Sequence, residues 1–392
     1  MELADKMACT GCGACAYVCP KQCISFQNDT YGASHPFIDN SRCIDCGRCQ
    51  TYCPAINQPE SYNPIQAYAA WSSDAEERRT SASGGIAAEI YKHAINNGWA
   101  IVGASFHDGF EVKLKLTDNI ATAKEFKNSK YVFSSAIDIY QDINKRLKDG
   151  SKIAIIALPC QIAAIKKVFQ KNLDNLLLVD LVCHGTTPHT YLEQYIRYMG
   201  ARCHKKIDTI TFRDVEAGTQ KFALSLFGTN GEKLYSSTSF KDTYQFAYHR
   251  MIAYRENCYH CHYANSRRSA DITIGDYKGL GQSAPCDFSE EKVSCILVNT
   301  EKGSGCINAM IDKKQIIAFR RPTEEPINGD SQLRHPVLKS YSRRLFEKRY
   351  DGDFIHTMHS VYIRTRFKEI LSCSYKRPMH IAKKIFRRFS SI

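Results

Sequence analysis

Two runs of four cysteines near the N-terminus constrain this chain more than any other feature of its sequence. Each run reads C-x2-C-x2-C-x3-C followed by proline, and the second run repeats the first 34 residues later. Three cysteines at this spacing wrap three corners of a 4Fe-4S cube, and the fourth reaches across to a second cluster. The first predicted ligand set is Cys9, Cys12, Cys15 and Cys53. The second predicted ligand set is Cys43, Cys46, Cys49 and Cys19.

Zinc is the alternative for paired cysteines, but a zinc site uses four ligands, commonly as two pairs. Here eight cysteines form two triplets with remote fourth members, which favours two 4Fe-4S clusters. The chain has 18 cysteines in 392 residues and opens with no apolar signal segment. We therefore expect reduced thiols in a cytoplasmic protein rather than disulfides in a secreted one.

The length of the chain predicts more than one domain. A segment rich in Pro, Asn and Gln over residues 56–64 reads as a linker. We expect a bacterial ferredoxin-like module at 1–57, a larger second domain at 65–320, and a basic helical extension at 321–392. The fold class predicted for the whole chain is α+β, with a mixed sheet in the second domain.

Strand-like and helix-like segments alternate through the second domain. Strands are predicted at 153–158, 176–183, 271–275 and 294–299, and helices at 86–96, 161–170 and 187–199. A meander is predicted at 207–213, 222–228 and 234–238, with a turn at Thr229–Glu232. No G-x-G-x-x-G follows a strand and no Walker A motif occurs, so a Rossmann nicotinamide site is unsupported.

Four further cysteines stand where a third cluster could be held. Cys160 and Cys183 each follow a predicted strand, and Cys258 and Cys261 form a C-x2-C pair. Neighbouring strands that end alike would bring the first two together at one edge of the sheet. The alternative is that these are small buried hydrophobic side chains, with the pair a zinc knuckle or a coincidence. Six other cysteines show no pattern and are interpreted as ordinary thiols: Cys23, Cys203, Cys286, Cys295, Cys306 and Cys373.

Three loops contain further candidate cofactor-binding or catalytic residues. The segment Ser81–Gly85 precedes a predicted helix, and a glycine pair at a helix N-terminus suits a phosphate, although Ser83 can equally be a plain N-cap. A second loop, Asn128–Tyr131, combines a cation with an aromatic ring. His184 follows a strand end and is a candidate for a catalytic proton donor, with a structural role as the alternative.

The sequence resembles the coenzyme F420 hydrogenase/dehydrogenase beta-subunit family from the cysteine runs to about residue 310. The resemblance is carried, in order, by TSASGG, NSKYVFSS, ALPCQIAAIKK, LVDLVCHGTTPH, the FRD of 212–214, YRENCYHCHYANSRRSADITIGDY and VSCILVNTEKG. The fused ferredoxin and basic tail resemble the branch of that family found beside polysaccharide-synthesis genes. Two departures from the family pattern are Ala157–Gln161, where G-T-P-C-Q is usual, and Tyr277-Lys278, where an aromatic pair is usual.

The resemblance implies a third 4Fe-4S cluster on Cys160, Cys183, Cys258 and Cys261, and an FAD. The candidate cofactor contacts that it implies are Ser83, Gly84, Gly85, Ser129, Lys130 and Tyr131. A lysine beside the flavin ring would stabilise the anionic reduced form, and Lys130 suits that role.

The formal net charge of +13 belongs mostly to the C-terminal tail, because residues 331–392 hold 15 Lys and Arg against four Asp and Glu. Lys376–Arg388 has the pattern of a basic amphipathic helix, which suits peripheral contact with an anionic membrane, an acidic partner, or simple solvation. Nothing in the chain indicates nucleic-acid binding.

These features predict an iron–sulfur flavoprotein oxidoreductase that passes electrons between ferredoxin-type clusters and FAD. Its redox partner would be a ferredoxin or another electron carrier, and its small-molecule substrate is unidentified. The alternatives are a non-enzymatic electron-relay subunit and a protein with structural clusters.

Overall fold

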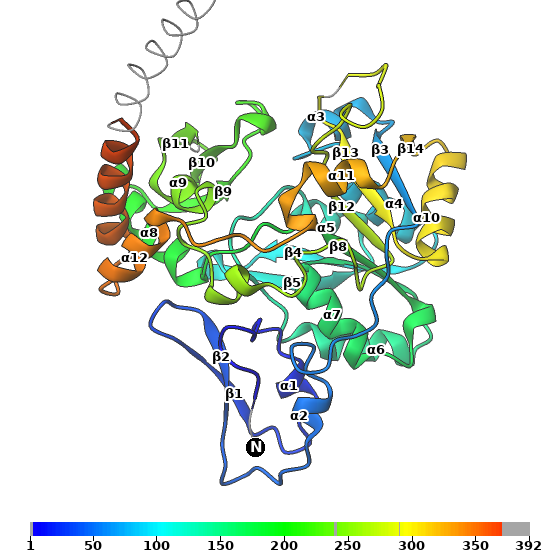
Figure 1. The fold of residues 1–392 in the computed structure, drawn as a ribbon, viewed down its shortest axis with the longest axis horizontal. Helices are drawn as coiled ribbons and strands as arrows, with labels where there is room; N and C mark the ends of the chain where they lie inside the picture. Colours follow the sequence, from blue (N-terminus) through cyan, green and yellow to red (C-terminus); the bar gives the residue numbers. More distant parts are fainter. Residues whose placement is uncertain (1–2, 239–240, 290, 371–392) are drawn as a thin grey trace, which may run out of the picture.

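The computed structural model describes residues 3–238, 241–289 and 291–370. The body of the molecule, from residue 65 onward, is built on a nine-stranded sheet with the order β14-β3-β13-β12-β8-β7-β4-β5-β6 (Figure 1). Its strands are β3 (Gln66–Ser72), β4 (Ala100–Phe106), β5 (Val112–Thr117), β6 (Ser134–Ser135), β7 (Ile153–Ala157), β8 (Leu176–Leu181), β12 (Ile272–Asp276), β13 (Ser294–Val298) and β14 (Ile316–Arg321). Strands β12, β8, β7 and β4 run parallel, and antiparallel pairs flank them. The predicted mixed sheet is confirmed.

Helices cover both faces of this sheet. Successive side chains of a strand point to opposite faces, so each strand contributes to the apolar core on both sides. In β7, Ile153 and Ile155 pack toward α6 and α7, whereas Ala154 and Ile156 pack toward α4 and α10. These helices are α4 (Ile86–Asn96), α6 (Ile139–Lys148), α7 (Pro159–Val168) and α10 (Glu301–Asp312). Shorter helices at the sheet's edges and ends are α3 (Ala75–Thr80), α5 (Ile120–Ala123) and α11 (Glu324–Gly329).

A second, three-stranded sheet has the order β11-β10-β9 and packs beside the large one (Figure 1). Its strands are β9 (Ile207–Thr211), β10 (Ala223–Gly228) and β11 (Lys233–Thr238). They share an apolar core with α8 (His189–Cys203), α9 (Thr243–His249), α12 (Tyr341–Arg349) and a helix over residues 354–370. Helix α12 and the helix over residues 354–370 are therefore packed into the body.

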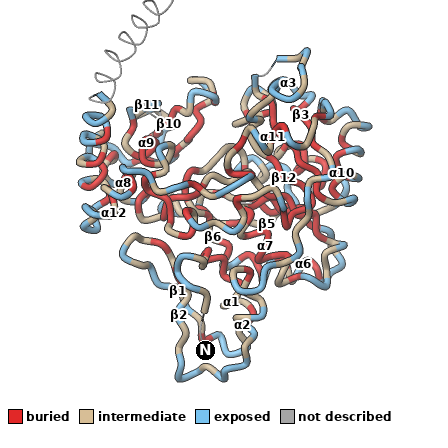
Figure 2. The backbone as a smooth tube through the Cα atoms, viewed as in Figure 1, coloured by how far each residue is buried: buried red, intermediate tan, exposed pale blue. Residues whose placement is uncertain are grey.

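The N-terminal module, residues 3–57, projects from one side of the body (Figure 1). It consists of two short helices, α1 (Ala14–Tyr17) and α2 (Arg48–Thr51), and a hairpin of β1 (Ile24–Asn28) and β2 (Ser34–Ile38). Cys12 and Ala14 are buried in the same apolar core as α6 and α7. Figure 2 shows that burial in the module is concentrated on the side that meets the body, while its far tip is exposed.

The strands and helices predicted for the body appear within a few residues of their predicted ends, and the helix over 86–96 has the predicted bounds. Strands β3, β4, β5, β6 and β14 are not among the predicted ones. Within the described part of the chain, no helix has both the length and the apolar character needed to cross a bilayer. The predicted amphipathic segment Lys376–Arg388 lies outside the described residues.

Candidate functional site: a line of cysteine sets leading to a basic loop

Two hollows in the N-terminal module gather the eight cysteines of the repeated motif. One hollow is lined by Cys43, Cys46, Cys49 and Cys19, and also by Cys23, whose Sγ lies 3.4 Å from Cys19 Sγ. The other is lined by Cys9, Cys12, Cys15 and Cys53. In each case three cysteines come from one motif and the fourth comes from the end of the helix in the other motif. This crossed grouping is the one that two 4Fe-4S clusters require.

The hollow nearer the body holds its thiols in a buried, mutually repulsive arrangement. Burial, with the neighbouring Cys9 and Cys53 adding to its effect, raises the pKa of Cys12 to about 11. Burial also raises the pKa of Cys15, with Cys12 and Cys9 adding to the effect. Thiolates grouped in this way need a compensating cation, which iron supplies. We call this set the proximal set and the set around Cys46, which is exposed, the distal set.

The four body cysteines also come together. Cys160 lies in the first turn of α7, directly after β7, and Cys183 follows β8; these two strands are adjacent and parallel. Cys258 lies in the short helix η5 (Glu256–His260) and Cys261 follows it. Burial raises the pKa of Cys160 well above its usual value, and Cys261, Cys183 and Cys258 raise it further, so all four lie within electrostatic reach. Among the described residues, no group of three or more His, Cys, Asp or Glu side chains is placed to hold a single metal ion.

A buried ion pair joins the two segments that carry these cysteines. Arg268 lies 3.0 Å from Asp180, and both side chains are almost fully buried. The Arg268 guanidinium also donates to Leu181 O at 2.9 Å, at the end of β8, and to Tyr263 O at 2.8 Å, just after Cys261. Arg268 thus fixes the Cys183 segment against the Cys261 segment.

The proximal set and the body set share one buried boundary. Tyr140 donates to Cys12 O at 2.8 Å, and Tyr263 donates to Pro54 O at 3.4 Å. Burial raises the pKa of Tyr263 well above its usual value, and Cys160, Cys12, Cys261 and Cys53 add to this effect. One tyrosine therefore lies within electrostatic reach of both cysteine sets.

The predicted phosphate loop lies at the start of α4. Ser83 donates to Val293 O at 3.0 Å, the Gly84 amide donates to Ser294 Oγ at 2.9 Å, and Gly85 is the N-terminal cap of the helix. Two cations from distant parts of the chain hold this loop. Arg213 donates to Ala82 O at 2.6 Å, and Lys292 donates to Ser81 O at 2.9 Å.

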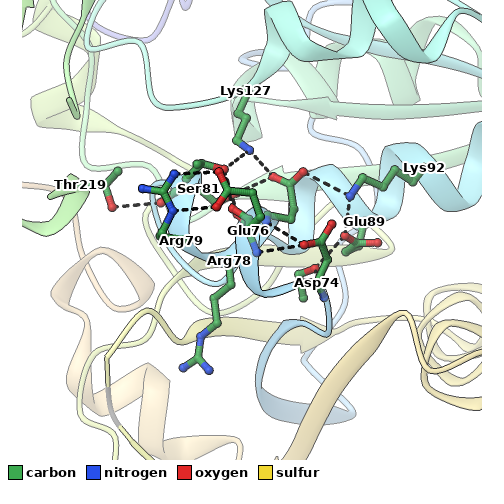
Figure 3. Close-up of polar contacts among 12 residues, drawn as sticks. Asp74, Glu76, Arg78, Arg79, Ser81, Glu89, Lys92, Lys127 and Thr219 are labelled. Atoms are coloured by element: carbon green, nitrogen blue, oxygen red, sulfur yellow. Dashed lines mark hydrogen bonds and ion pairs between the residues drawn. The ribbon is translucent and has the colours of Figure 1, made fainter. Parts of the chain in front are cut away.

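The surroundings of this loop are strongly basic. Burial lowers the pKa of Lys292, and Arg213, Arg79, Lys127 and Arg78 lower it further. Figure 3 shows Lys127 and Arg79 in the network of polar contacts beside the loop. Lys127 lies 2.5 Å from Glu77, and Arg79 lies 2.7 Å from Glu76. Arg213 is paired with Asp276 at 2.8 Å, whereas no carboxylate among the described residues pairs with Lys292. The charge of Lys292 is therefore available to an anion.

The second predicted loop meets the first through Arg213. The Arg213 Nε donates to the Tyr131 hydroxyl at 2.7 Å, and Ser129 lies beside that hydroxyl. Lys130 donates to Lys127 O at 3.2 Å, and burial lowers its pKa to about 8. The Tyr131 ring stacks on Tyr248 with centroids 4.3 Å apart. The structure therefore brings together both predicted cofactor loops.

A run of aromatic rings connects these loops to the body cysteines. Tyr248 packs against Tyr254 with centroids 5.2 Å apart. Burial raises the pKa of Tyr254, and Cys183 and Cys258 add to this effect. The rings of Tyr248 and Tyr254 thus lie between Tyr131 and the body set, and Tyr248 is itself within electrostatic reach of Cys183.

His184 has partners of its own. Lys278 Nζ lies 2.6 Å and Asp330 Oδ2 lies 3.2 Å from its Nε2 atom. A second histidine, His249, is not among the predicted site residues, and its ring meets Tyr131 edge-on at 5.2 Å. Burial lowers the pKa of His249 to about 4, with Arg213 and His184 adding to this effect. No spacing signal points to His249, Arg213 or Lys292, because their partners lie far away along the chain.

Two family models match the chain. One, which describes the C-terminal part of the beta subunit of coenzyme F420 hydrogenase/dehydrogenase, matches residues 150–324. The other, a 4Fe-4S dicluster domain, matches residues 8–56. The second match confirms the prediction of two 4Fe-4S clusters in the N-terminal module.

Two curated relatives are similar at low identity. The beta subunit of F420-dependent formate dehydrogenase 1 of Methanococcus maripaludis is 21% identical over 273 residues, 68% of this chain and 65% of that protein. The F subunit of the F(420)H(2) dehydrogenase of Methanosarcina mazei is 22% identical over 367 residues, 87% of this chain and 95% of that protein. The chain thus spans slightly less than two thirds of the first relative. A solved structure, the F420-reducing [NiFe] hydrogenase complex from Methanosarcina barkeri, aligns with a TM-score of 0.44 and 16% identity over 74% of this chain and 90% of that one.

Proposed function

Because this chain belongs to the coenzyme F420 hydrogenase/dehydrogenase beta-subunit family and carries an N-terminal 4Fe-4S dicluster domain, we propose that it is an iron–sulfur flavoprotein subunit that transfers electrons within a larger oxidoreductase complex. The observation that carries the proposal is the order of its sites. The distal set is followed by the proximal set, the body set, two tyrosine rings and the basic loops.

In this proposal the body set holds a third 4Fe-4S cluster and the basic loops hold FAD. When bound, the clusters carry single electrons, and a flavin joins one-electron carriers to two-electron chemistry. The loop at Ser83, Gly84 and Gly85 would face the phosphates, with Lys292 and Arg213 supplying positive charge. Lys130 would stabilise negative charge on the ring system, beside Ser129 and Tyr131.

The exposed distal set is the proposed entry point for a redox partner protein, such as a ferredoxin or another carrier. Both curated relatives are named as subunits of dehydrogenases that use F420. We therefore propose that F420 is the first two-electron carrier to test, and that a partner protein supplies further chemistry. The proposal also includes His184 as a proton donor, and its Nε2 atom already lies beside Lys278 and Asp330.

The test is a count of iron, sulfide and flavin after anaerobic reconstitution of the full chain. We expect about twelve irons and one FAD, since each cube holds about four irons. Cys258→Ser should lower the iron count to about eight, and the buried but ungrouped Cys295→Ser should leave it at about twelve. A wild-type count of about eight irons would contradict the third cluster, and no flavin after loading would contradict the FAD site.

Electron transfer is tested in the same preparation with reduced F420 and a viologen acceptor. We expect flavin-dependent electron transfer that Cys258→Ser reduces by at least about tenfold, because the body set is the proposed link between flavin and module. Transfer that is unchanged in Cys258→Ser would contradict the proposed route. Activity that appears only with a copurified partner would favour the relay alternative.

A further inference from the structure

Arg255 is a buried arginine at the boundary between the N-terminal module and the body. It precedes η5, which carries Cys258, and only 2% of its surface is exposed. Its main chain is fixed on both sides: its amide donates to Thr186 O at 2.9 Å, and its carbonyl accepts from the Cys258 amide at 3.0 Å. The side chain therefore starts from the loop that holds the body set and reaches toward the module.

The guanidinium is only partly satisfied by the protein. Its Nη1 donates to Thr10 O at 3.1 Å, between Cys9 and Cys12, and its Cζ atom lies 3.9 Å from the centroid of the Phe133 ring. The Nε and Nη2 atoms are buried without a hydrogen-bond partner. Nη2 lies so close to Gly11 that a Cβ there would be 2.9 Å away, so the proximal loop needs glycine to admit this arginine.

The charge of Arg255 is also unpaired by the protein. Among the described residues, no carboxylate lies at ion-pair distance from it, and the adjacent Glu256 instead pairs with Lys339 and Arg343. Arg255 lies within electrostatic reach of Cys9 in the proximal set and of Cys160 in the body set. A buried cation with unused donors requires nearby anions, and the two cysteine sets are the anions on either side.

We propose that Arg255 is a shared charge between two iron–sulfur sites: its free N–H groups donate to sulfur at the proximal and body sets, and its charge raises the reduction potential of both. The inference rests on the proposed function for the body set, and only on the dicluster domain for the proximal set. A fixed cation stabilises the more negative, reduced state of a cluster, and hydrogen bonds to sulfur act in the same direction. Reduction adds one electron and breaks no bond, and the guanidinium keeps its proton throughout.

The test is an anaerobic redox titration of the reconstituted full chain, followed by absorbance and electron paramagnetic resonance. The distal step is identified first in Cys46→Ser. In Arg255→Gln we expect the equilibrium constant for one-electron reduction to fall at least about tenfold at the proximal and body sites, about 59 mV each. The distal step should stay unchanged.

Arg343→Gln is the matched control, because Arg343 donates to Ile252 O and Tyr254 O in the same loop. Its Cζ atom lies 5.8 Å from the ring centroid of Tyr31 in the module, and Tyr31 lines neither cysteine hollow. An equal shift in Arg343→Gln would mean that loop displacement is the cause and would overturn the proposal, as would native potentials in Arg255→Gln. If Arg255→Gln loses its clusters, the same redox titration of Arg255→Lys tests the proposal instead. It keeps the charge without the planar fork, and we expect a smaller shift in the same direction at both sites; native potentials would overturn the proposal.

Iron counts separate the two proposals. A wild-type protein with about eight irons removes the body cluster and with it the proposed function, while the expected shift at the proximal site remains testable. A protein with about twelve irons and unshifted potentials in both Arg255 variants contradicts the role of Arg255 alone.

Discussion

Lys130 illustrates how burial prepares a single side chain for a negatively charged ligand. Its Nζ donates to two carbonyls of its own loop, Lys127 O and Asn128 O. Burial lowers its pKa to about 8, and the distant Glu125 only partly opposes this. In the unfolded chain a lysine titrates near 10.4. Below pH 8 the ammonium is charged in both states, so the folded state bears the cost of desolvating it.

This cost makes a pH-dependent prediction. Between about pH 8 and 10.4 the folded protein loses the Lys130 proton while the unfolded chain keeps it, so the free energy of unfolding rises across that window. Lys130→Met should therefore be more stable than the wild type at pH 7, by about 1–2 kcal/mol for this partly exposed side chain. The difference should vanish near pH 10. The measurement is anaerobic thermal unfolding of the flavin-free, cluster-loaded protein, with the exposed Lys145→Met as control. A stability difference that is independent of pH would refute this account.

At this scale the sequence predicts the residues whose partners are close in the chain. The eight cysteines of the module can be predicted as cluster ligands because their spacing along the chain is the spacing that a pair of 4Fe-4S clusters requires. The role of Arg255 cannot be predicted from the sequence, since it depends on contact with Thr10, which lies 245 residues away along the chain. The same holds for Lys292, which gains its role only because Ser81 lies beside it in the fold.

At the scale of elements, the ends of two adjacent strands organise the body set. The buried segments of β7 and β8 are visible in the sequence as apolar runs, and their parallel adjacency follows from the short connection through α7. The position of the C-x2-C pair does not follow from any local pattern. It depends on Arg268, which connects the end of β8 to the turn after Cys261.

Removing one partner of this buried ion pair should therefore destabilise the body set selectively. Arg268→Met leaves Asp180 buried without its partner, which typically costs about 3–5 kcal/mol. We expect a lower melting temperature and an iron count of about eight, with the module's clusters retained. The control is Arg197→Met, which removes an exposed pair with Glu193 and should cost less than about 0.5 kcal/mol. Anaerobic calorimetry and iron analysis report both effects; a full iron count in Arg268→Met would show that the ion pair does not position the ligands.

At the scale of the whole molecule, the docking of the module decides whether the sites form one line. The β1–β2 turn lies against α8 and the chain near α12, where Tyr31 stacks on Tyr350 with centroids 5.4 Å apart. Gly32 in this turn has a φ of +77°, and a Cβ there would be 1.9 Å from Thr190 Oγ1. The close approach of the two parts was not predictable, because nothing in either segment alone encodes its partner.

Gly32→Ala should push the module away from the body while leaving each cluster hollow intact. Gly231→Ala is the matched control, since Gly231 has a φ of +74° but a Cβ added there would meet nothing within 4 Å; it carries the same backbone strain without the clash. We expect both variants to hold about twelve irons, but only Gly32→Ala to lose magnetic coupling between the proximal and body clusters and to slow flavin reduction from the module. Adding Thr190→Gly removes the clashing side chain and should restore both. Equal losses in Gly32→Ala and Gly231→Ala would assign the effect to turn strain, and docking would then not control transfer.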